Sequence, residues 1–158
     1  MANTQSMCTS FLGELLTATH NFGTAPTRGA STADTFKGAL YLASATYNAA
    51  TTAYSATGEV SGTNYTAGGV TVTNATPPAS TNTSATAGTA YWTPSASLVY
   101  TNVTLTTAFD TVLIYNSTQS NKAVGVYTFG SQTITAGTFT LTMPSNTTSA
   151  ALIRIATT

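Results

Sequence analysis

Apolar and polar residues alternate in short runs along most of the chain. The clearest run is Thr138–Met143, where Phe139, Leu141 and Met143 alternate with threonines. Such alternation is typical of a strand with one face in the core and the other in solvent. The run Thr111–Tyr115 is apolar on both faces and predicts a central, buried strand. Further strands are predicted at Thr35–Leu42, Val70–Asn74, Leu98–Thr106, Ala123–Phe129 and Leu152–Ala156.

These runs are closely spaced and are separated by Gly, Asn, Ser and Pro residues that favour turns. The pattern predicts a mainly β fold, an antiparallel β-sandwich of either the Ig-like or the jelly-roll type. The stretch Ser44–Ala56 predicts either a short helix or a polar loop. Ala75–Ala87, which contains Pro77 and Pro78, predicts an exposed loop. Trp92 is expected to lie in the core.

The N-terminal residues Met1–Arg28 follow a helical pattern instead. Gly23 and Pro26 are typical residues for ending the helix. We therefore predict an arm with a short amphipathic helix over residues 1–28, followed by a β-sandwich domain over residues 29–158. A helix of about three turns is marginal alone, so its apolar face packs either on its own domain or on a neighbouring subunit. The positions at helical spacing are Phe11, Leu12, Leu15, Leu16 and Thr19.

Charged residues are scarce and balanced. Four Lys or Arg and four Asp or Glu make up 5% of the 158 residues, and the formal net charge is zero. Recognition of nucleic acid through its phosphates needs clustered Lys and Arg, so this class of function is excluded. Nearly a quarter of the residues are Thr, which suits strands and keeps a surface hydrated without charge. A nearly neutral protein tends to associate, which indicates a component of an assembly.

The chain has no arrangement of residues that is typical of catalysis. Its four acidic residues lie twenty or more positions apart, so no spacing suggests an acid–base pair or a cation site. The single cysteine, Cys8, and the single histidine, His20, form neither a zinc site nor an activated nucleophile by themselves. The sequence therefore predicts no enzyme, no bound metal and no cofactor. Met1–Ser10 lacks Lys and Arg, which predicts neither a secretory signal nor a membrane span.

Three stretches together resemble small virion proteins that are encoded among the head and tail genes of tailed bacteriophages and prophages. The stretches are Thr35–Thr73, Val112–Gly130 and Gly137–Ala156, preceded by NFGT at Asn21–Thr24. The most specific piece is GEVSGTNYTAGGVTVT, in which Glu59 and Tyr65 stand out as family features.

This resemblance implies a structural component of the phage particle, made in the bacterial cytoplasm and then assembled into the virion. The leading hypothesis is a capsid cement or decoration protein, a homo-oligomer, with a trimer favoured, that bridges capsomers of the major capsid protein or contacts other virion subunits. Neither nucleic acid nor a membrane is an expected partner. The alternative hypotheses are a tail, neck or fibre component that acts as connector or host-adhesion module, and a bacterial surface adhesin. The candidate interface residues are Phe11, Leu15, Leu16 and Phe22 of the arm and Tyr65, which is expected to be exposed in a loop.

Overall fold

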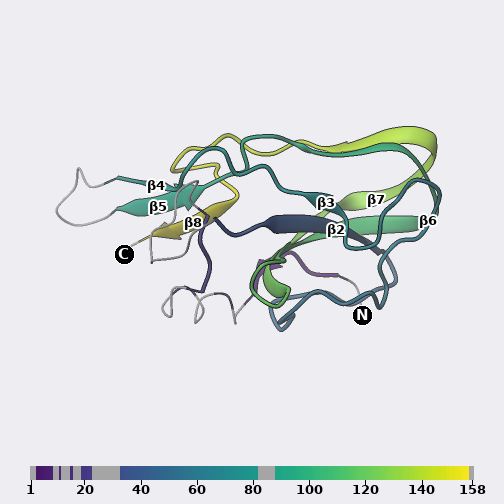
Figure 1. Ribbon diagram of the computed structural model, residues 1–158, viewed down its shortest axis with the longest axis horizontal. Coiled ribbons are helices and arrows are strands. Elements are labelled where there is room, and N and C mark those ends of the chain that lie inside the picture. Colours follow the sequence, from purple (N-terminus) through teal and green to yellow (C-terminus); the bar gives the residue numbers. More distant parts are fainter. Residues whose placement is uncertain are drawn as a thin grey trace. The chain divides into compact units, whose positions relative to one another are not determined.

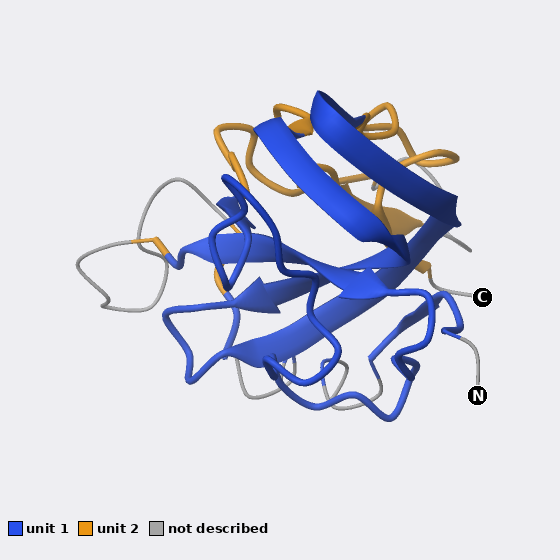
Figure 2. Cartoon of the chain, turned by 90° about the vertical axis from the view of Figure 1, so that its right-hand side faces the viewer, with its two compact units in different colours: residues 1–20, 34–71, 99–140 blue, residues 21–33, 72–98, 141–158 orange. Residues whose placement is uncertain are grey.

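The computed structural model describes residues 3–8, 11, 15, 19–22, 33–81 and 88–156, and β-strands dominate the regular structure there (Figure 1). The strands form two antiparallel sheets, which confirms the predicted mainly β class and is consistent with a β-sandwich. The chain clusters into two compact units (Figure 2). Unit 1 comprises Met1–His20, Asp34–Thr71 and Val99–Thr140, and unit 2 comprises Asn21–Ala33, Val72–Leu98 and Leu141–Thr158.

Unit 1 is built on a five-stranded sheet with the strand order β1-β7-β6-β2-β3. The register between β2 and β6 runs from Phe36 opposite Asn116 to Leu42 opposite Phe109, with an irregularity after Tyr41. The strands are β1 (Ser6–Met7), β2 (Phe36–Leu42), β3 (Val70–Thr71), β6 (Leu98–Asn116) and β7 (Lys122–Leu141).

β6 and β7 are each much longer than the sequence predicts. Each of these strands joins two runs that were predicted as separate strands. No Pro interrupts the residues between the runs, so strand pairing continues through them. β7 turns back on itself, as Figure 1 shows, and Gly130 and Ala136 have the positive φ angles of 83° and 49° in this region. The Tyr100 hydroxyl near the start of β6 donates a hydrogen bond of 2.7 Å to the carbonyl of Gly38 on β2. The first part of β6 therefore lies against β2, and the bent strands enclose a core.

The core of unit 1 lies between these layers. The predicted central strand Thr111–Tyr115 is confirmed, because every residue of it is buried on both faces in the middle of β6. Phe109 and Phe139 meet edge to face with ring centroids 5.2 Å apart, an arrangement that aromatic pairs prefer. Fully buried large side chains of this unit include Phe36, Leu40, Tyr41, Leu105, Phe109, Leu113 and Ile114.

Unit 2 contains a three-stranded sheet with the order β4 (Ala79–Ser80), β5 (Thr89–Trp92) and β8 (Ile153–Ala156). Trp92 is only 2% exposed, so the prediction that it is a core residue is confirmed. Its ring packs 4.7 Å from that of Phe22, and its indole N–H donates to the carbonyl of Thr76. The described residues 75–80 of the predicted exposed loop are exposed, although two of them form β4, and residues 82–87 lie outside the described part.

No N-terminal helix is seen, and most of the predicted one lies outside the described part, because residues 9–10, 12–14 and 16–18 are not described. Before this stretch, Ser6 and Met7 form β1 and pair with Val126 and Gly125 of β7. A strand of two residues leaves no period-two signal, so the sequence pattern does not predict it. The boundary at residue 28 stays a prediction.

Candidate functional site

Glu59 is the centre of a hydrogen-bonded cluster in unit 1. It lies on the long connection between β2 and β3, where it forms an isolated bridge with Tyr41. One carboxylate oxygen accepts the hydroxyl of Tyr65 and the backbone N–H of Gly68, both at 2.7 Å. The other oxygen accepts the hydroxyl of Tyr54 at 2.7 Å. Both oxygens are therefore engaged, and these charge-assisted bonds are among the stronger ones that proteins form.

Tyr65 links this carboxylate to the sheet. Its hydroxyl accepts the backbone N–H of Leu40 on β2 at 3.0 Å and donates to Glu59. The carbonyl of Leu40 in turn accepts the N–H of Val60 at 3.0 Å. β3 pairs with only two residues of β2, Lys37 and Gly38. Tyr65 and the backbone of Val60 therefore satisfy both backbone groups of Leu40 beyond the end of β3, where an open edge would otherwise remain, and Glu59 holds the Tyr65 hydroxyl in place.

Further tyrosines surround the pair and attach loops to the sheet. The Tyr115 hydroxyl donates to the carbonyl of Gly68 at 2.8 Å, and its ring stacks 4.8 Å from Tyr54. The ring of Tyr100 stacks 6.0 Å from Tyr65. We call Glu59 and the six tyrosines around it the Glu59–tyrosine cluster. Its tyrosines are Tyr41, Tyr47, Tyr54, Tyr65, Tyr100 and Tyr115.

Burial and the nearby carboxylate keep these phenols protonated. Desolvation, and secondly the charge of Glu59, raise the pKa of Tyr115 to about 12. The pKa values of Tyr54, Tyr65 and Tyr100 are also raised, with burial as the largest cause in each case. A phenol with a raised pKa is a poor general base at neutral pH. The protonated hydroxyls of Tyr54, Tyr65 and Tyr115 donate hydrogen bonds that fix the connection between β2 and β3.

Two adjacent glycines allow the loop to approach β2 closely. Gly69 has a φ angle of 73°, and a Cβ there would lie 1.8 Å from the carbonyl oxygen of Gly38. Gly68 has a φ angle of 87° and presents both its N–H and its carbonyl to the cluster. The sequence Ala67-Gly68-Gly69 thus forms a turn, which also brings the chain within hydrogen-bonding distance of Glu59.

A second polar cluster lies at the end of β6. The side-chain oxygen of Asn116 accepts the backbone N–H groups of Thr118 and Gln119, which fixes the orientation of its amide. Its amide nitrogen therefore donates to Asp34 at 2.8 Å and to Nδ1 of His20 at 3.1 Å. His20 is 7% exposed and packs against Phe11. The sequence pattern gave no reason to place this histidine beside Asp34, and the fold joins them through Asn116.

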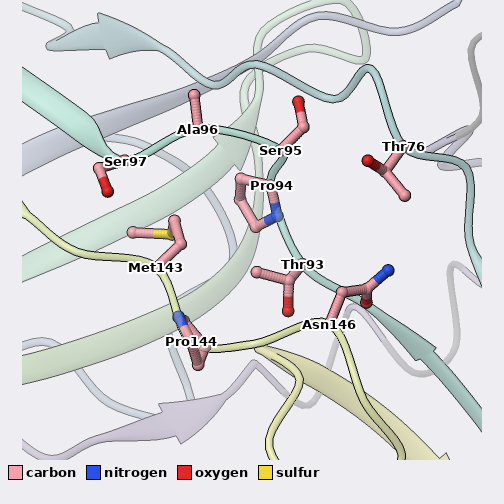
Figure 3. A pocket seen from close by; sticks show the side chains of 9 residues that line it. All are labelled: Thr76, Thr93, Pro94, Ser95, Ala96, Ser97, Met143, Pro144 and Asn146. Atoms are coloured by element: carbon pink, nitrogen blue, oxygen red, sulfur yellow. The ribbon is translucent and has the colours of Figure 1, made fainter.

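A pocket of about 310 Å³ lies within unit 2 (Figure 3). The segment Thr93–Ser97 forms one side, and Met143, Pro144 and Asn146 form the other. The lining carries hydroxyl and amide groups but no charge. The side-chain oxygen of Asn146 is buried without a hydrogen-bond partner among the described residues.

The candidate interface residues that the structure describes differ in burial and belong to both units. Phe11 is fully buried in unit 1, and Phe22 is 8% exposed beside Trp92 in unit 2. Leu15 is half-buried, and Leu16 lies outside the described residues. Tyr65 is half-buried with its hydroxyl turned to β2, so the prediction of an exposed Tyr65 is wrong. Their role as interface residues stays a prediction.

Sequence reasoning singled out Glu59 and Tyr65 but missed the residues around them. A lone acidic residue among four nearby tyrosines was the available signal. Within the described ranges, no three His, Cys, Asp or Glu side chains are grouped so that they could hold a metal ion. No helix in those ranges is long and apolar enough to cross a membrane. Cys8 is fully buried.

Comparisons with protein-family models, curated proteins and solved structures give no match. The resemblance to small phage virion proteins therefore stays a prediction, and the class that the fold defines is a mainly β protein with two antiparallel sheets.

Proposed function

We propose that this chain is a structural protein of a bacteriophage particle and that it acts as a capsid cement or decoration protein. The observation that carries the proposal is the Glu59–tyrosine cluster. Its central pair, Glu59 and Tyr65, lies in GEVSGTNYTAGGVTVT, the segment most specific to the resemblance, and the polar groups of this pair hold loops to a sheet. Side chains that hold loops to a sheet in this way support a mechanical role for the protein.

The charge of the chain also supports an assembly role. With four basic and four acidic residues among 158, long-range repulsion between copies is small, so many copies can pack closely. Weak contacts of each copy add up when many copies bind a symmetric shell. On this proposal the chain has no catalytic activity and no cofactor, and its partners are the major capsid protein, other virion subunits and further copies of itself, with a trimer favoured. It is made in the host cytoplasm and functions in the virion.

Burial of area across capsomer boundaries would oppose the outward pressure of packaged DNA. Particles assembled without the protein should therefore form but release their DNA at a lower temperature than complete particles. Adding back the purified chain should restore the original release temperature. Equal release temperatures with and without the protein would contradict the cement role.

A tail, neck or fibre component is the second candidate, and the uncharged pocket of unit 2 favours it. Hydroxyl and amide groups that line it can form hydrogen bonds to a neutral ligand such as a host glycan. Binding of purified protein to host cells, lost in Asn146→Leu, would support this adhesion role. Absence of binding would argue against it.

A further inference from the structure

The outer edge of β7 is paired only over its first residues. β1 pairs with Gly125 and Val126, and the Gln5 side chain accepts from the N–H and the hydroxyl of Thr128 at 3.4 and 3.2 Å. Beyond Thr128, the described part of the chain provides no further strand on this side of β7. The segment Ser131–Thr135 that follows is exposed except for a half-buried Ile134.

Hydrogen bonds on both sides of this segment show which backbone groups point outward. The carbonyl of Val124 points to β1, and the N–H of Thr128 points to Gln5. Before Gly130, the backbone N–H and carbonyl groups of even-numbered residues therefore point to the outer edge of β7. At Gly130 the positive φ interrupts the regular alternation. After Gly130, the N–H of Ala136 donates to the Thr104 side chain of β6 at 3.0 Å. The backbone groups of even-numbered residues in this segment therefore point to β6. Ser131, Thr133 and Thr135 therefore direct their N–H and carbonyl groups to the open edge.

We propose that Ser131–Thr135 pairs in antiparallel fashion with the same segment of a second copy, about a twofold axis at Thr133. In this register Thr133 lies opposite its own equivalent, and Ser131 lies opposite Thr135 of the other copy. Each of these facing pairs exchanges two main-chain bonds, which gives about six bonds in all. Cross-strand pairs of hydroxyl side chains add to them.

A second copy is the occupant that the segment itself favours. No charged residue occurs between Lys122 and Arg154, so two copies of this edge meet without like-charge repulsion. Natural proteins protect open edges with Lys, Pro or bulges. Ser131–Thr135 carries neither Lys nor Pro, and the irregular residues Gly130 and Ala136 limit pairing to this five-residue segment without blocking it. A twofold contact requires one self-complementary surface, and this edge has that property.

The contact is weak by itself. Each hydrogen bond contributes little in net terms, and association has a large entropic cost. We therefore expect a dissociation constant for this contact on the order of 10⁻⁴ to 10⁻³ M. Such an affinity keeps the chain soluble as it is made and becomes effective once many copies are held on one surface. The biological setting of the inference rests on the proposed function, whereas the contact itself can be measured on the purified chain.

The test is sedimentation equilibrium of the full chain up to millimolar concentration, together with hydrogen exchange of peptides that cover Ser131–Thr135. Thr133→Pro removes the central outward N–H, and Thr133→Lys places two like charges at the twofold axis. Thr106→Lys is the matched control, because Thr106 is exposed in the same sheet but on the interior strand β6. Circular dichroism establishes that each variant is folded.

We expect the native chain and Thr106→Lys to dimerise, with amide protection in Ser131–Thr135 that grows with concentration. Both Thr133 variants should dimerise at least tenfold more weakly. A chain that stays monomeric at millimolar concentration, or folded Thr133 variants with unchanged affinity, would overturn the inference. A monomeric chain found at high copy number in particles would leave the proposed function standing. A dimeric chain absent from particles would instead contradict the function alone.

Discussion

Replacement of Tyr65 by Phe removes one oxygen atom that joins three parts of unit 1. The hydroxyl accepts the N–H of Leu40 at 3.0 Å and donates to Glu59 at 2.7 Å. The aromatic ring and its stacking on Tyr100 are retained in the variant. The change therefore tests the hydrogen bonds with little disturbance of packing.

The magnitude follows from the two partners that are left behind. A buried N–H without an acceptor costs about 1–3 kcal/mol, and a hydrogen bond to a charged group contributes about 1.5–3 kcal/mol. Glu59 keeps its bond from Gly68, which moderates the second loss. We expect Tyr65→Phe to lower the free energy of unfolding by about 2–4 kcal/mol, a large part of the ~5–15 kcal/mol of a typical domain.

The assay is urea denaturation followed by far-ultraviolet circular dichroism. Tyr91→Phe is the control, because the Tyr91 hydroxyl makes no hydrogen bond to a described residue, and its effect should stay within about 0.5 kcal/mol. A double-mutant cycle of Tyr65→Phe with Glu59→Gln should show a coupling of about 1 kcal/mol or more. A loss below about 0.5 kcal/mol for Tyr65→Phe, or additive effects in the cycle, would refute the structural role assigned to the pair.

Three further predictions concern the same unit. The free energy of unfolding should fall above about pH 10, because the unfolded chain then releases phenolic protons that the folded cluster retains. The pKa of Tyr115 in the folded chain, for example, is about 12. Urea melts at pH 8 and pH 11 measure this loss of stability, and equal stability at the two pH values would contradict it. Gly69→Ala should lower the free energy of unfolding by more than about 4 kcal/mol, because its Cβ meets the Gly38 carbonyl. Gly130→Ala has open space around the Cβ and should lower it by only about 1–2 kcal/mol. Similar melting temperatures for the two variants would refute the close approach of Gly69 to β2. Asn116→Ala should cost about 3 kcal/mol or more, because it removes four hydrogen bonds. Thermal melts that match the native chain would show that the cluster is not stabilising.

The strand content could be predicted from the sequence because period two is a local property. β2 and the central part of β6 lie where alternation or continuous apolar character places them. The joining of runs into β6 and β7 was not predictable, because residues between the runs, such as Ala108 and Asp110, do not favour a strand by themselves. The two-residue β1 depends on pairing with Gly125 and Val126, which no local pattern encodes.

The candidate site was predictable only in part. Glu59 and Tyr65 stood out by their place in the most specific segment, but their mutual hydrogen bond requires a turn at Gly62–Asn64 and the positive φ angles of Gly68 and Gly69. Tyr100 joins the cluster because the first part of β6 lies over β2, where its hydroxyl donates to the carbonyl of Gly38. This contact spans more than sixty positions in sequence and arises from the fold alone.

The central claim is that the chain is a structural subunit of the phage head, and its copy number in purified virions tests this most directly. Mass spectrometry against the major capsid protein gives the ratio. The account predicts about one copy per capsid subunit, as expected for a protein that follows the symmetry of the shell. A dozen or fewer copies, on the order of one tail or neck ring, would contradict the cement role, and absence from the particle would contradict the structural assignment itself.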